Sequence, residues 1–246
     1  VGVYQLGGLG NYMNAATELQ SGRGEPLKDT ARVLGRYYDC VVWRTYRQSD
    51  LEEFAEFAGV PVINGLTDYA HPCQVLADLM TIYREKGRLA DLTIGLCGDL
   101  KFGRTVHSLV AAMSRCTGIR FVLISPEELK LPRYVKDEYL KKPGVPYTQS
   151  TSLEAVMPEL DVLYMTRVQR ERFFNEEDYL RLRDSYILTP DKLETAKPDM
   201  SILHPLPRVN EIAAAVDNDP RACYFKQVKN GRYIRMALML KLLGID

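Results

Sequence analysis

Short apolar segments rich in branched side chains alternate with longer amphipathic segments along almost the whole chain, and this alternation constrains the fold more than any other feature. The short segments are typical of buried strands, and the longer ones have the spacing of helices. Strands that alternate with helices form parallel sheets covered by helices, so the predicted class is α/β. The strands are expected at 1–6, 39–44, 61–66, 92–98, 120–125, 161–166, 185–189 and 200–204.

Two domains are expected, each a parallel sheet flanked by helices. A helix predicted from about Pro72 to Lys86 is followed by a fresh series of strands and helices, so we place the boundary at this helix. The first domain is assigned to 1–72 and the second to 73–228. The last helix, 229–246, is apolar over most of its surface, so it is expected to pack in a core by returning to the first domain. Because Val1 stands within a predicted strand and no methionine precedes it, the first domain is expected to be incomplete at its start.

The balance of charges argues against several classes of partner. Lys plus Arg number 32 and Asp plus Glu number 32, so no net field favours nucleic acid or an anionic membrane. The five cysteines are an odd number without the spacing of metal ligands, which indicates reduced thiols in the cytoplasm. We recognise no apolar run long enough to span a bilayer, no metal cluster and no Ser-His-Asp order. The expected partner is a small molecule, and no cofactor or metal is expected.

Polar side chains follow several of the predicted strands. Ligands of parallel α/β sheets bind outside the carboxyl ends of the strands, so side chains at these positions are candidates for binding. An arginine follows four strands, at Arg44, Arg104, Arg167 and Arg208. Guanidinium groups hold carboxylates and phosphates through paired hydrogen bonds, so we expect a ligand, or a pair of ligands, with several anionic groups. The other candidates at strand ends are His71, Gln74, Asp99, Thr166, Gln169 and His204.

Two of the histidines are given different interpretations. His71 precedes Pro72 at a predicted helix start, where the free amides favour an anion or a carbonyl oxygen. A histidine that only caps the helix remains an alternative for this position. His107 lies beside the apolar stripe of a helix, and we interpret it as structural. Chemistry at such a site depends on positioning and on stabilisation of charge.

The segment SILHPLPRVNE, at 201–211, begins as a buried strand and is then interrupted by Pro205 and Pro207. Proline cannot donate to a sheet, so the chain is expected to leave the sheet as a stiff loop of the kind that often holds ligands. Two other segments, LGGLGNY and GDLKFGR, invite comparison with a dinucleotide fingerprint but lack its glycine spacing. A dehydrogenase is therefore the weaker alternative.

Four motifs, in this order, resemble the aspartate and ornithine carbamoyltransferase family: HPCQVLADLMTI, GDLKFGRTVHSL, VLYMTRVQRERF and HPLPRVNEI. The resemblance covers nearly all of the chain. It implies the two-domain α/β fold of that family and the transfer of a carbamoyl group from carbamoyl phosphate to an amine.

The two halves of the chain resemble different members of the family. Segments before Gly98 are more similar to ornithine enzymes, and those after it to aspartate enzymes. An ornithine site is expected to carry an acidic loop, but the matching positions, 166–172 and 204–207, carry arginine in place of acid. A buried Arg167 facing an ammonium group is strongly unfavourable. L-Aspartate is therefore the predicted acceptor, with N-carbamoyl-L-aspartate and phosphate as products, a reaction of de novo pyrimidine biosynthesis.

The resemblance also implies the role of each site residue. Arg44, His71 and Gln74 are expected to hold carbamoyl phosphate and to form the catalytic group, with Arg44 and His71 near its carbonyl oxygen. The carboxylates of aspartate are expected at Arg104, Arg167 and Gln169. The Leu206-Pro207 bond is expected to be cis, with main-chain carbonyls of this loop directed at the substrate nitrogens.

Assembly follows from the same resemblance. The family forms homotrimers in which a loop enters the neighbouring active site, and the matching loop of this chain offers Gln20 and Arg23. A multiple of trimers and a regulatory chain are further possibilities. The S-T-R-T phosphate motif of the family is expected upstream of Val1. An ornithine or modified-ornithine carbamoyltransferase, and a non-catalytic homologue, therefore remain as alternatives.

Overall fold

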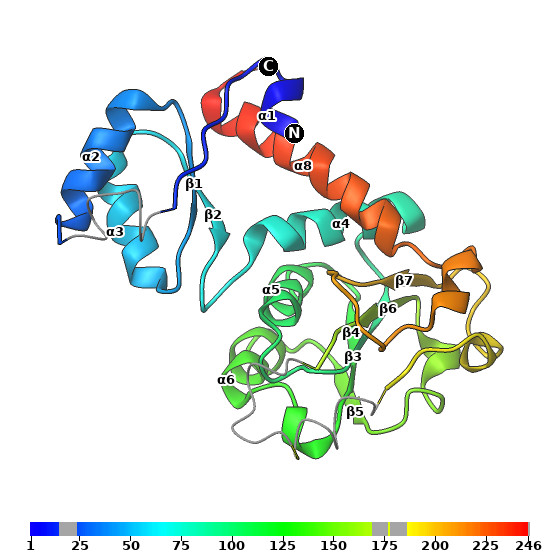
Figure 1. The fold of residues 1–246 in the computed structure, drawn as a ribbon. Helices are drawn as coiled ribbons and strands as arrows, with labels where there is room; N and C mark the ends of the chain where they lie inside the picture. Colours follow the sequence, from blue (N-terminus) through cyan, green and yellow to red (C-terminus); the bar gives the residue numbers. More distant parts are fainter. Residues whose placement is uncertain (15–23, 169–176, 178–185, 246) are drawn as a thin grey trace. The chain divides into compact units, whose positions relative to one another are not determined.

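The computed structural model describes residues 1–14, 24–168, 177 and 186–245 (Figure 1). The chain divides into two compact units. The first contains Val1–Ala77 together with Asn230–Asp246, and the second contains Asp78–Lys229. Among the helices of the described residues, none has the length and apolar character needed to cross a membrane.

The first unit contains a parallel pair of strands, β1 (Val41–Arg44) and β2 (Val62–Leu66). The helices α2 (Leu27–Tyr37) and α3 (Gln48–Ala58) pack together beside these strands. Their shared core is small and consists of Ala31, Leu34, Phe54 and Ala58.

Close packing of α2 on α3 depends on a glycine. A Cβ atom placed on Gly35 would lie 1.7 Å from the carbonyl oxygen of Ala58. On the sheet side of α3, the rings of Trp43 and Phe54 lie 4.2 Å apart between centroids. The end of β1 is therefore fixed by packing on α3.

The first residues form a short helix, so the strand predicted at 1–6 is wrong. Helix α1 (Gly2–Gln5) contains no buried residue, and Val1 and Tyr4 are exposed. A strand needs a neighbour to satisfy its amides, and within the described residues the sheet of this unit consists of β1 and β2. A helical turn satisfies its amides locally, as the bond from the Gln5 amide to the Val1 carbonyl shows.

Two helices, α4 (Pro72–Lys86) and α8 (Tyr224–Leu243), each begin in one unit and end in the other. The part of α8 in the first unit is less buried than its apolar sequence predicts. From Arg232 to Ile245 the side chains are half-buried or exposed, and the exposed ones include apolar Leu242 and Leu243.

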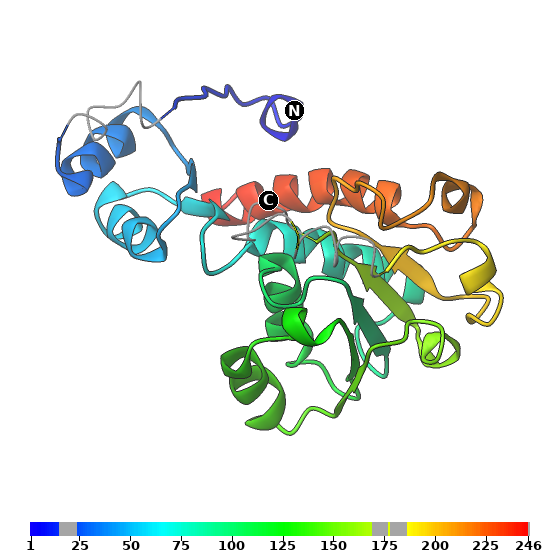
Figure 2. The ribbon, with the colours of Figure 1, turned by 60° about the horizontal axis from the view of Figure 1, so that its bottom comes forward.

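The second unit is built on a five-stranded sheet in the order β5-β4-β3-β6-β7, with every neighbouring pair parallel. The sheet confirms the predicted α/β class. On one side of it lie α5 (Arg104–Met113) and α6 (Arg133–Lys136), and short helices between residues 151 and 200 lie on the other (Figure 1 and Figure 2). The strands are β3 (Thr93–Cys97), β4 (Arg120–Ile124), β5 (Tyr147–Ser150), β6 (Val162–Met165) and β7 (Ser201–Leu203).

Two strand assignments in this unit differ from the sequence pattern. The polar edge strand β5 has no apolar run and was not predicted. The segment predicted as a strand at 185–189 is reduced to one bridge between Leu188 and Ile212, because Pro190 follows at once and cannot extend a ladder. Ser185 lies outside the described residues.

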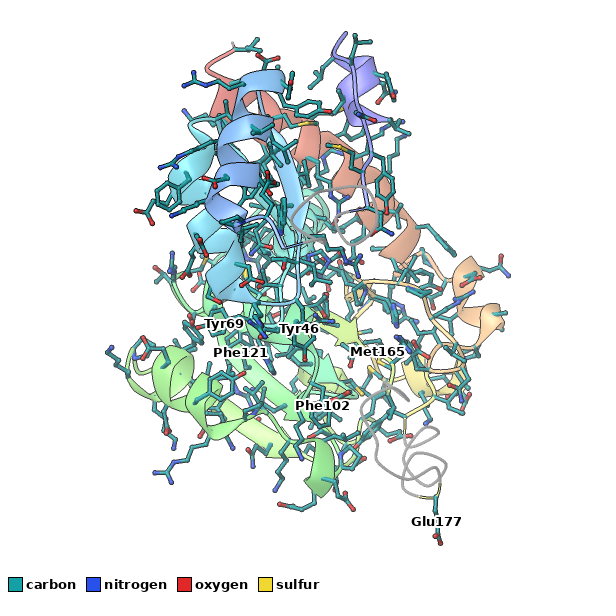
Figure 3. The ribbon with its side chains drawn as sticks, turned by 60° about the vertical axis from the view of Figure 1, so that its left-hand side comes forward. Tyr46, Tyr69, Phe102, Phe121, Met165 and Glu177 are labelled. Carbon is teal, nitrogen blue, oxygen red and sulfur yellow. The ribbon has the colours of Figure 1, made fainter. Side chains whose placement is uncertain are left out.

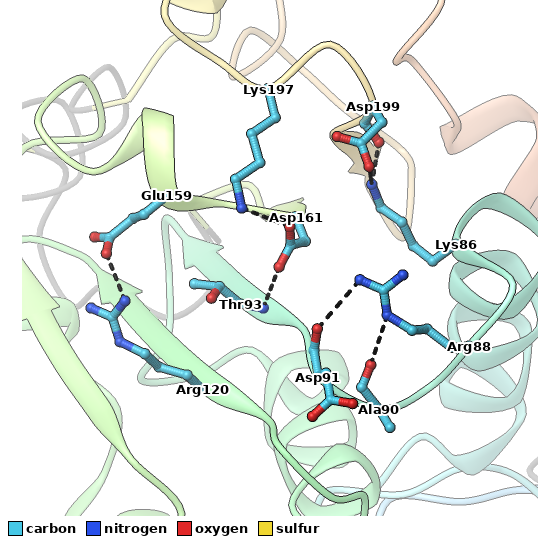
Figure 4. A network of polar contacts seen from close by, with 10 residues as sticks. All are labelled: Lys86, Arg88, Ala90, Asp91, Thr93, Arg120, Glu159, Asp161, Lys197 and Asp199. Carbon is cyan, nitrogen blue, oxygen red and sulfur yellow. Dashed lines mark hydrogen bonds and ion pairs between the residues drawn. The ribbon is translucent and has the colours of Figure 1, made fainter.

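A polar network covers the amino ends of the strands (Figure 4). One carboxylate oxygen of Asp161 accepts the Thr93 amide at 2.7 Å, and the other accepts the Lys197 ammonium at 2.7 Å. Arg120 and Glu159 form a further pair at 2.7 Å. This edge is closed by internal partners, whereas the ligand candidates follow the opposite, carboxyl ends.

Candidate active site

In the first unit, two predicted site residues follow neighbouring parallel strands. Arg44 is the last residue of β1, and its side chain is exposed. His71 follows β2 and immediately precedes α4. Because β1 and β2 are parallel, the segments that carry Arg44 and His71 leave the sheet at the same edge. A register shift between Trp43 and Arg44 redirects the strand at its end.

The loops beyond these strands are tied together by hydrogen bonds. The Thr45 amide donates to the Leu66 carbonyl at 3.2 Å, and the Asp68 amide donates to the Tyr46 carbonyl at 2.8 Å. Tyr46 and Tyr69, one from each loop, are exposed (Figure 3). The loops therefore form one braced surface at the carboxyl edge of the sheet.

His71 caps helix α4 through its backbone. Its carbonyl oxygen accepts the amides of Gln74 at 3.1 Å and Val75 at 3.2 Å, and Pro72 is the first helical residue. Proline suits this position because the first helical amides have no partner within the helix. Backbone capping leaves the imidazole to a separate role, so the ligand interpretation and the capping interpretation are compatible. Gln74 lies within the first turn of α4 and is half-buried.

Cys73, in the first turn of α4, is not an activated nucleophile. Burial raises the pKa of the Cys73 thiol, and the nearby Arg235 offsets only part of that rise. The thiol donates to the Asn64 carbonyl at 3.2 Å. The neutral thiol therefore links β2 to the start of α4 and serves packing.

In the second unit, the ends of β3 and β6 are locked to each other. The Thr166 amide donates to the Cys97 carbonyl at 2.9 Å, and the Thr166 hydroxyl donates to the same oxygen at 3.2 Å. Gly98 has φ 116°, and a Cβ there would lie 2.3 Å from the Thr166 carbonyl oxygen. Only glycine fits this approach. Arg167 follows directly and is half-buried.

The loop after β3 leads to Arg104. The buried carboxylate of Asp99 accepts the amides of Lys101 at 3.1 Å and Phe102 at 2.9 Å, which folds the loop into a tight turn (Figure 3 labels Phe102). Gly103 then caps α5, and Arg104 is its first residue. Arg104 and Arg167 thus follow β3 and β6, which are adjacent strands of one parallel sheet.

His107 has the structural role predicted for it. Its Nε2 lies 2.9 Å from the Leu100 carbonyl, and its Nδ1 lies 3.4 Å from the Tyr134 hydroxyl. A carbonyl only accepts, so Nε2 carries the hydrogen. Burial lowers the pKa of His107, so the ring is held neutral.

The loop after β7 has the predicted cis bond between Leu206 and Pro207. Arg208, one of the four arginines expected to meet a ligand, has partners within the described residues. Its guanidinium makes a two-point contact with the Asp217 carboxylate, 2.6 Å for Nη2, and also contacts the Tyr224 hydroxyl. Asp217 follows the loop and neutralises this arginine. The hydrogen bonds from Arg208 and Tyr224 hold the pKa of Asp217 below its usual value.

Three predicted site residues, Gln20, Arg23 and Gln169, lie outside the described residues. Conversely, the structure contains buried polar residues near the β7 loop that the sequence interpretation missed, namely Asp78, Glu211 and Gln227. Asp78 and Gln227 lie on helices, where no local pattern marks a polar side chain as buried. Glu211 lies six residues after Pro205, in an irregular segment. Its proximity to His204 is therefore evident only in the folded loop.

The fold and the candidate site define an α/β protein of two units, with Arg44 at the carboxyl edge of one parallel sheet and Arg104 and Arg167 at that of the other. The chain belongs to the aspartate/ornithine carbamoyltransferase family. Residues 1–84 match the family model of its carbamoyl-P binding domain, and residues 90–242 match the model of its Asp/Orn binding domain.

Similar proteins include the aspartate carbamoyltransferase catalytic subunits of two bacteria. That of Lachnoclostridium phytofermentans is 56% identical over 98% of this chain and 78% of its own length. That of Clostridium acetobutylicum is 58% identical over 91% of this chain and 73% of its own length.

Solved structures of aspartate transcarbamoylases are also similar to this chain. The catalytic subunit of M. jannaschii aspartate transcarbamoylase has a TM-score of 0.91 and 38% identity, covering 99% of this chain and 79% of that one. Aspartate transcarbamoylase from Trypanosoma cruzi, in complex with N-(phosphonacetyl)-L-aspartic acid, has a TM-score of 0.88 and 35% identity, covering 98% and 77%.

Proposed function

We propose that this protein transfers the carbamoyl group of carbamoyl phosphate to the amine of L-aspartate. The neutral amine attacks the carbonyl carbon, a C–N bond forms, and the bond from that carbon to the phosphate oxygen breaks. The products are N-carbamoyl-L-aspartate and phosphate, and the departing phosphate can accept the proton that the amine loses. In the cell this reaction serves de novo pyrimidine biosynthesis in the cytoplasm.

One observation carries the choice of acceptor: Arg104 and Arg167 follow adjacent parallel strands of the second unit. Two guanidinium groups at one sheet edge suit a ligand with two carboxylates, because each can hold a carboxylate through paired hydrogen bonds. Ornithine has one carboxylate and a second ammonium, which such an edge disfavours. The relatives described above are aspartate carbamoyltransferase catalytic subunits, and they support the same choice, as does the Trypanosoma cruzi enzyme in complex with aspartate and phosphate.

The donor, in this proposal, is held by residues of the first unit. Arg44, His71 and Gln74 form the catalytic group around carbamoyl phosphate, with Arg44 and His71 at its carbonyl oxygen. Negative charge grows on that oxygen as the amine attacks, so donors placed there bind the transition state more tightly than the ground state. The positive end of the helix dipole at the start of α4 adds to the same effect. A complex of the Trypanosoma cruzi relative with carbamoyl phosphate supports this donor.

The acceptor is held by the second unit. Arg104 and Arg167 bind its carboxylates and Gln169 assists them, while main-chain carbonyls of the Leu206-Pro207 segment accept hydrogen bonds from substrate nitrogens. We assign 1–72 with 229–246 to carbamoyl phosphate binding and 73–228 to aspartate binding. The matched family models are named for the same two ligands.

We also propose a homotrimer, or a multiple of one, in which the loop carrying Gln20 and Arg23 enters the site of the neighbouring chain. A regulatory chain is a further possible partner of such an assembly.

The test of the reaction is a colorimetric ureido assay of the full-length protein with carbamoyl phosphate and either L-aspartate or L-ornithine. We expect product with aspartate and little with ornithine. A preference for ornithine would overturn the assignment of the acceptor, and no product with either would support a non-catalytic homologue.

A further inference from the structure

The loop after β7 is closed by two buried side chains that meet across it. His204 begins the loop and is 1% exposed, and Glu211 ends it and is 3% exposed. The His204 Nε2 lies 2.7 Å from the Glu211 Oε1. Neither side chain reaches the surface, so neither can touch a substrate.

The hydrogen bonds of His204 determine where its proton lies. Its Nδ1 accepts the Leu206 amide at 2.8 Å, and a ring nitrogen that accepts carries no hydrogen. Nε2 must then carry the hydrogen and donate to Glu211. One ring therefore connects the backbone at Leu206 to the carboxylate at the far end of the loop. Leu206 has φ 51°, a conformation that a bulky residue keeps only when its surroundings hold it.

The second oxygen of Glu211 holds the other half of the loop. It accepts the amides of Val209 and Asn210, each at 3.0 Å. Burial alone would raise the pKa of Glu211, but the hydrogen bonds from His204 and from the backbone outweigh burial and lower that pKa. The group is thus a charged carboxylate whose acceptor sites are filled by this loop.

These contacts set the direction of a main-chain carbonyl. In a trans peptide the C=O points opposite to the N–H. The Leu206 amide points inward to His204, so the Pro205 carbonyl points away from the buried ring. The loop consequently presents an acceptor on the side away from the core.

A second set of contacts anchors the loop to the sheet. The His204 amide donates to the Gln227 Oε1 at 2.9 Å, and the Gln227 Nε2 donates to the Asp78 Oδ1 at 2.6 Å. The other oxygen of Asp78 accepts the Tyr164 hydroxyl at 3.0 Å. Tyr164 lies on β6, the strand that leads to Arg167. The loop and the strand that leads to Arg167 are therefore fixed through one buried network within the second unit.

We propose that His204 and Glu211 are positioning residues for the acceptor: they hold the loop so that its outward carbonyl meets the substrate nitrogen. The inference rests on the proposed function, because it needs an acceptor amine in the second unit. It goes further in assigning a role to two residues that do not contact the ligand.

Three substitutions separate the parts of this clamp. Glu211→Gln keeps the size of the side chain but places an NH₂ group or a weaker acceptor against the inward amides of Val209 and Asn210. His204→Asn can keep an acceptor near Nδ1 for Leu206 and loses the donor to Glu211. His204→Gln can keep the donor and loses the acceptor for Leu206. Glu159→Gln is the matched control, since it makes the same chemical change in a pair at the amino edge of the sheet.

The variants are compared with the wild-type chain by steady-state kinetics, by hydrogen exchange and by thermal unfolding. We expect Glu211→Gln and His204→Gln to lower kcat/KM for aspartate by about tenfold or more. The Kd of carbamoyl phosphate, measured in the same samples, should change by less than about twofold. His204→Asn should lose less kcat/KM than His204→Gln, and amide protection should fall at Leu206, Val209 and Asn210 in Glu211→Gln. Glu159→Gln should match the wild type in these kinetics.

Folded variants with a lower melting temperature but unchanged kcat/KM would overturn the proposal, because the clamp would then serve stability alone. A wild-type chain without activity on aspartate would overturn the proposed function instead. Hydrogen exchange would still decide the clamp in that case: loss of protection confined to 204–211 would support it, and unchanged protection there would overturn it.

Discussion

The Thr166 amide donates a hydrogen bond to the Cys97 carbonyl at 2.9 Å, directly beyond the last paired residues of β6 and β3. The two strands therefore leave the sheet in fixed register, and Gly98 is needed because a side chain there would collide with Thr166. Arg167 is the next residue after this lock. The contacts that fix the ends of these strands are made by Thr166, Cys97 and Gly98 and do not include the side chain of Arg167.

For this reason we expect Arg167→Ala to weaken the binding of aspartate and to leave carbamoyl phosphate binding largely intact. Loss of a charge-assisted contact costs about 1.5–3 kcal/mol, which corresponds to a rise in the KM of aspartate of roughly 10- to 150-fold. Carbamoyl phosphate binding can be followed by the fluorescence of Trp43, the one tryptophan of the chain, which precedes Arg44.

Arg133→Ala is the control for loss of a positive charge, because Arg133 is 89% exposed and pairs with Asp137 on a helix surface. It should leave both ligands unaffected. A fall in carbamoyl phosphate affinity with an unchanged KM for aspartate in Arg167→Ala would contradict the role assigned to Arg167.

His71→Ala should act on turnover. The backbone of His71 caps α4, and this function survives the substitution because it uses the carbonyl oxygen. The lost imidazole removes a donor from an oxygen whose charge grows in the transition state, so kcat should fall by roughly 10²- to 10³-fold. Kinetics and separate ligand titrations measure this, and a raised Kd for carbamoyl phosphate with unchanged kcat would argue against it.

The sequence predicted the strands of both sheets wherever burial left an apolar run. It failed where burial does not determine the structure. β5 is a polar edge strand that pairs only with β4, and 1–6 is apolar but has no neighbour to pair with in the described residues. Periodicity reports the environment of a side chain, whereas the pairing of a backbone depends on residues distant in sequence.

The same limit applies to the site. The order of strands in an α/β fold predicted that Arg44, Arg104 and Arg167 would follow strand ends. It did not predict that Arg208 would be neutralised by Asp217, or that His204 would face Glu211. Both partners lie several residues further along an irregular segment, and the folding of that segment decides which charges meet.

Stability should depend on pH through His107. Burial lowers its pKa in the folded state, so the unfolded chain binds the proton more tightly. The stabilisation is complete above the unfolded pKa of about 6.5 and is lost as the pH falls towards the folded pKa. Between about pH 7.5 and about pH 5.5, the free energy of unfolding of the wild type should fall more than that of His107→Gln.

Urea denaturation at several pH values measures this difference. Glutamine keeps a donor for the Leu100 carbonyl, so the contact is preserved. Because glutamine does not titrate, the side chain no longer contributes to the difference in proton binding between the folded and unfolded states. Tyr134→Phe alters the neighbour of His107 and retains the titrating ring, so it should keep the pH dependence of the wild type. Parallel profiles for wild type and His107→Gln would contradict the prediction.

Shared sites can be tested by mixing two inactive chains. If the loop with Arg23 enters a neighbouring site, an Arg23→Ala chain and a His71→Ala chain are each weak alone. Mixed trimers then contain some sites with an intact Arg23 and an intact His71, so activity should reappear. Mass measurements must show that mixed trimers have formed, and no recovery in them would indicate sites that use residues of one chain.

Gly35→Ala should destabilise the first unit. The added Cβ would lie 1.7 Å from the Ala58 carbonyl oxygen, a backbone atom at the end of α3 that no side-chain rotation can move away. The helices must separate, which opens the small core of Ala31, Leu34 and Phe54, so we expect a loss of about 3 kcal/mol or more in unfolding free energy. Alanine is otherwise the better helix former, which makes destabilisation a specific sign of the close approach.

Gly10→Ala is the control, since the nearest atom to its added Cβ lies at 3.7 Å, and it should be close to neutral. Chemical denaturation of both variants measures the effect, and a Gly35→Ala chain as stable as the wild type would show that α2 and α3 do not pack at this distance.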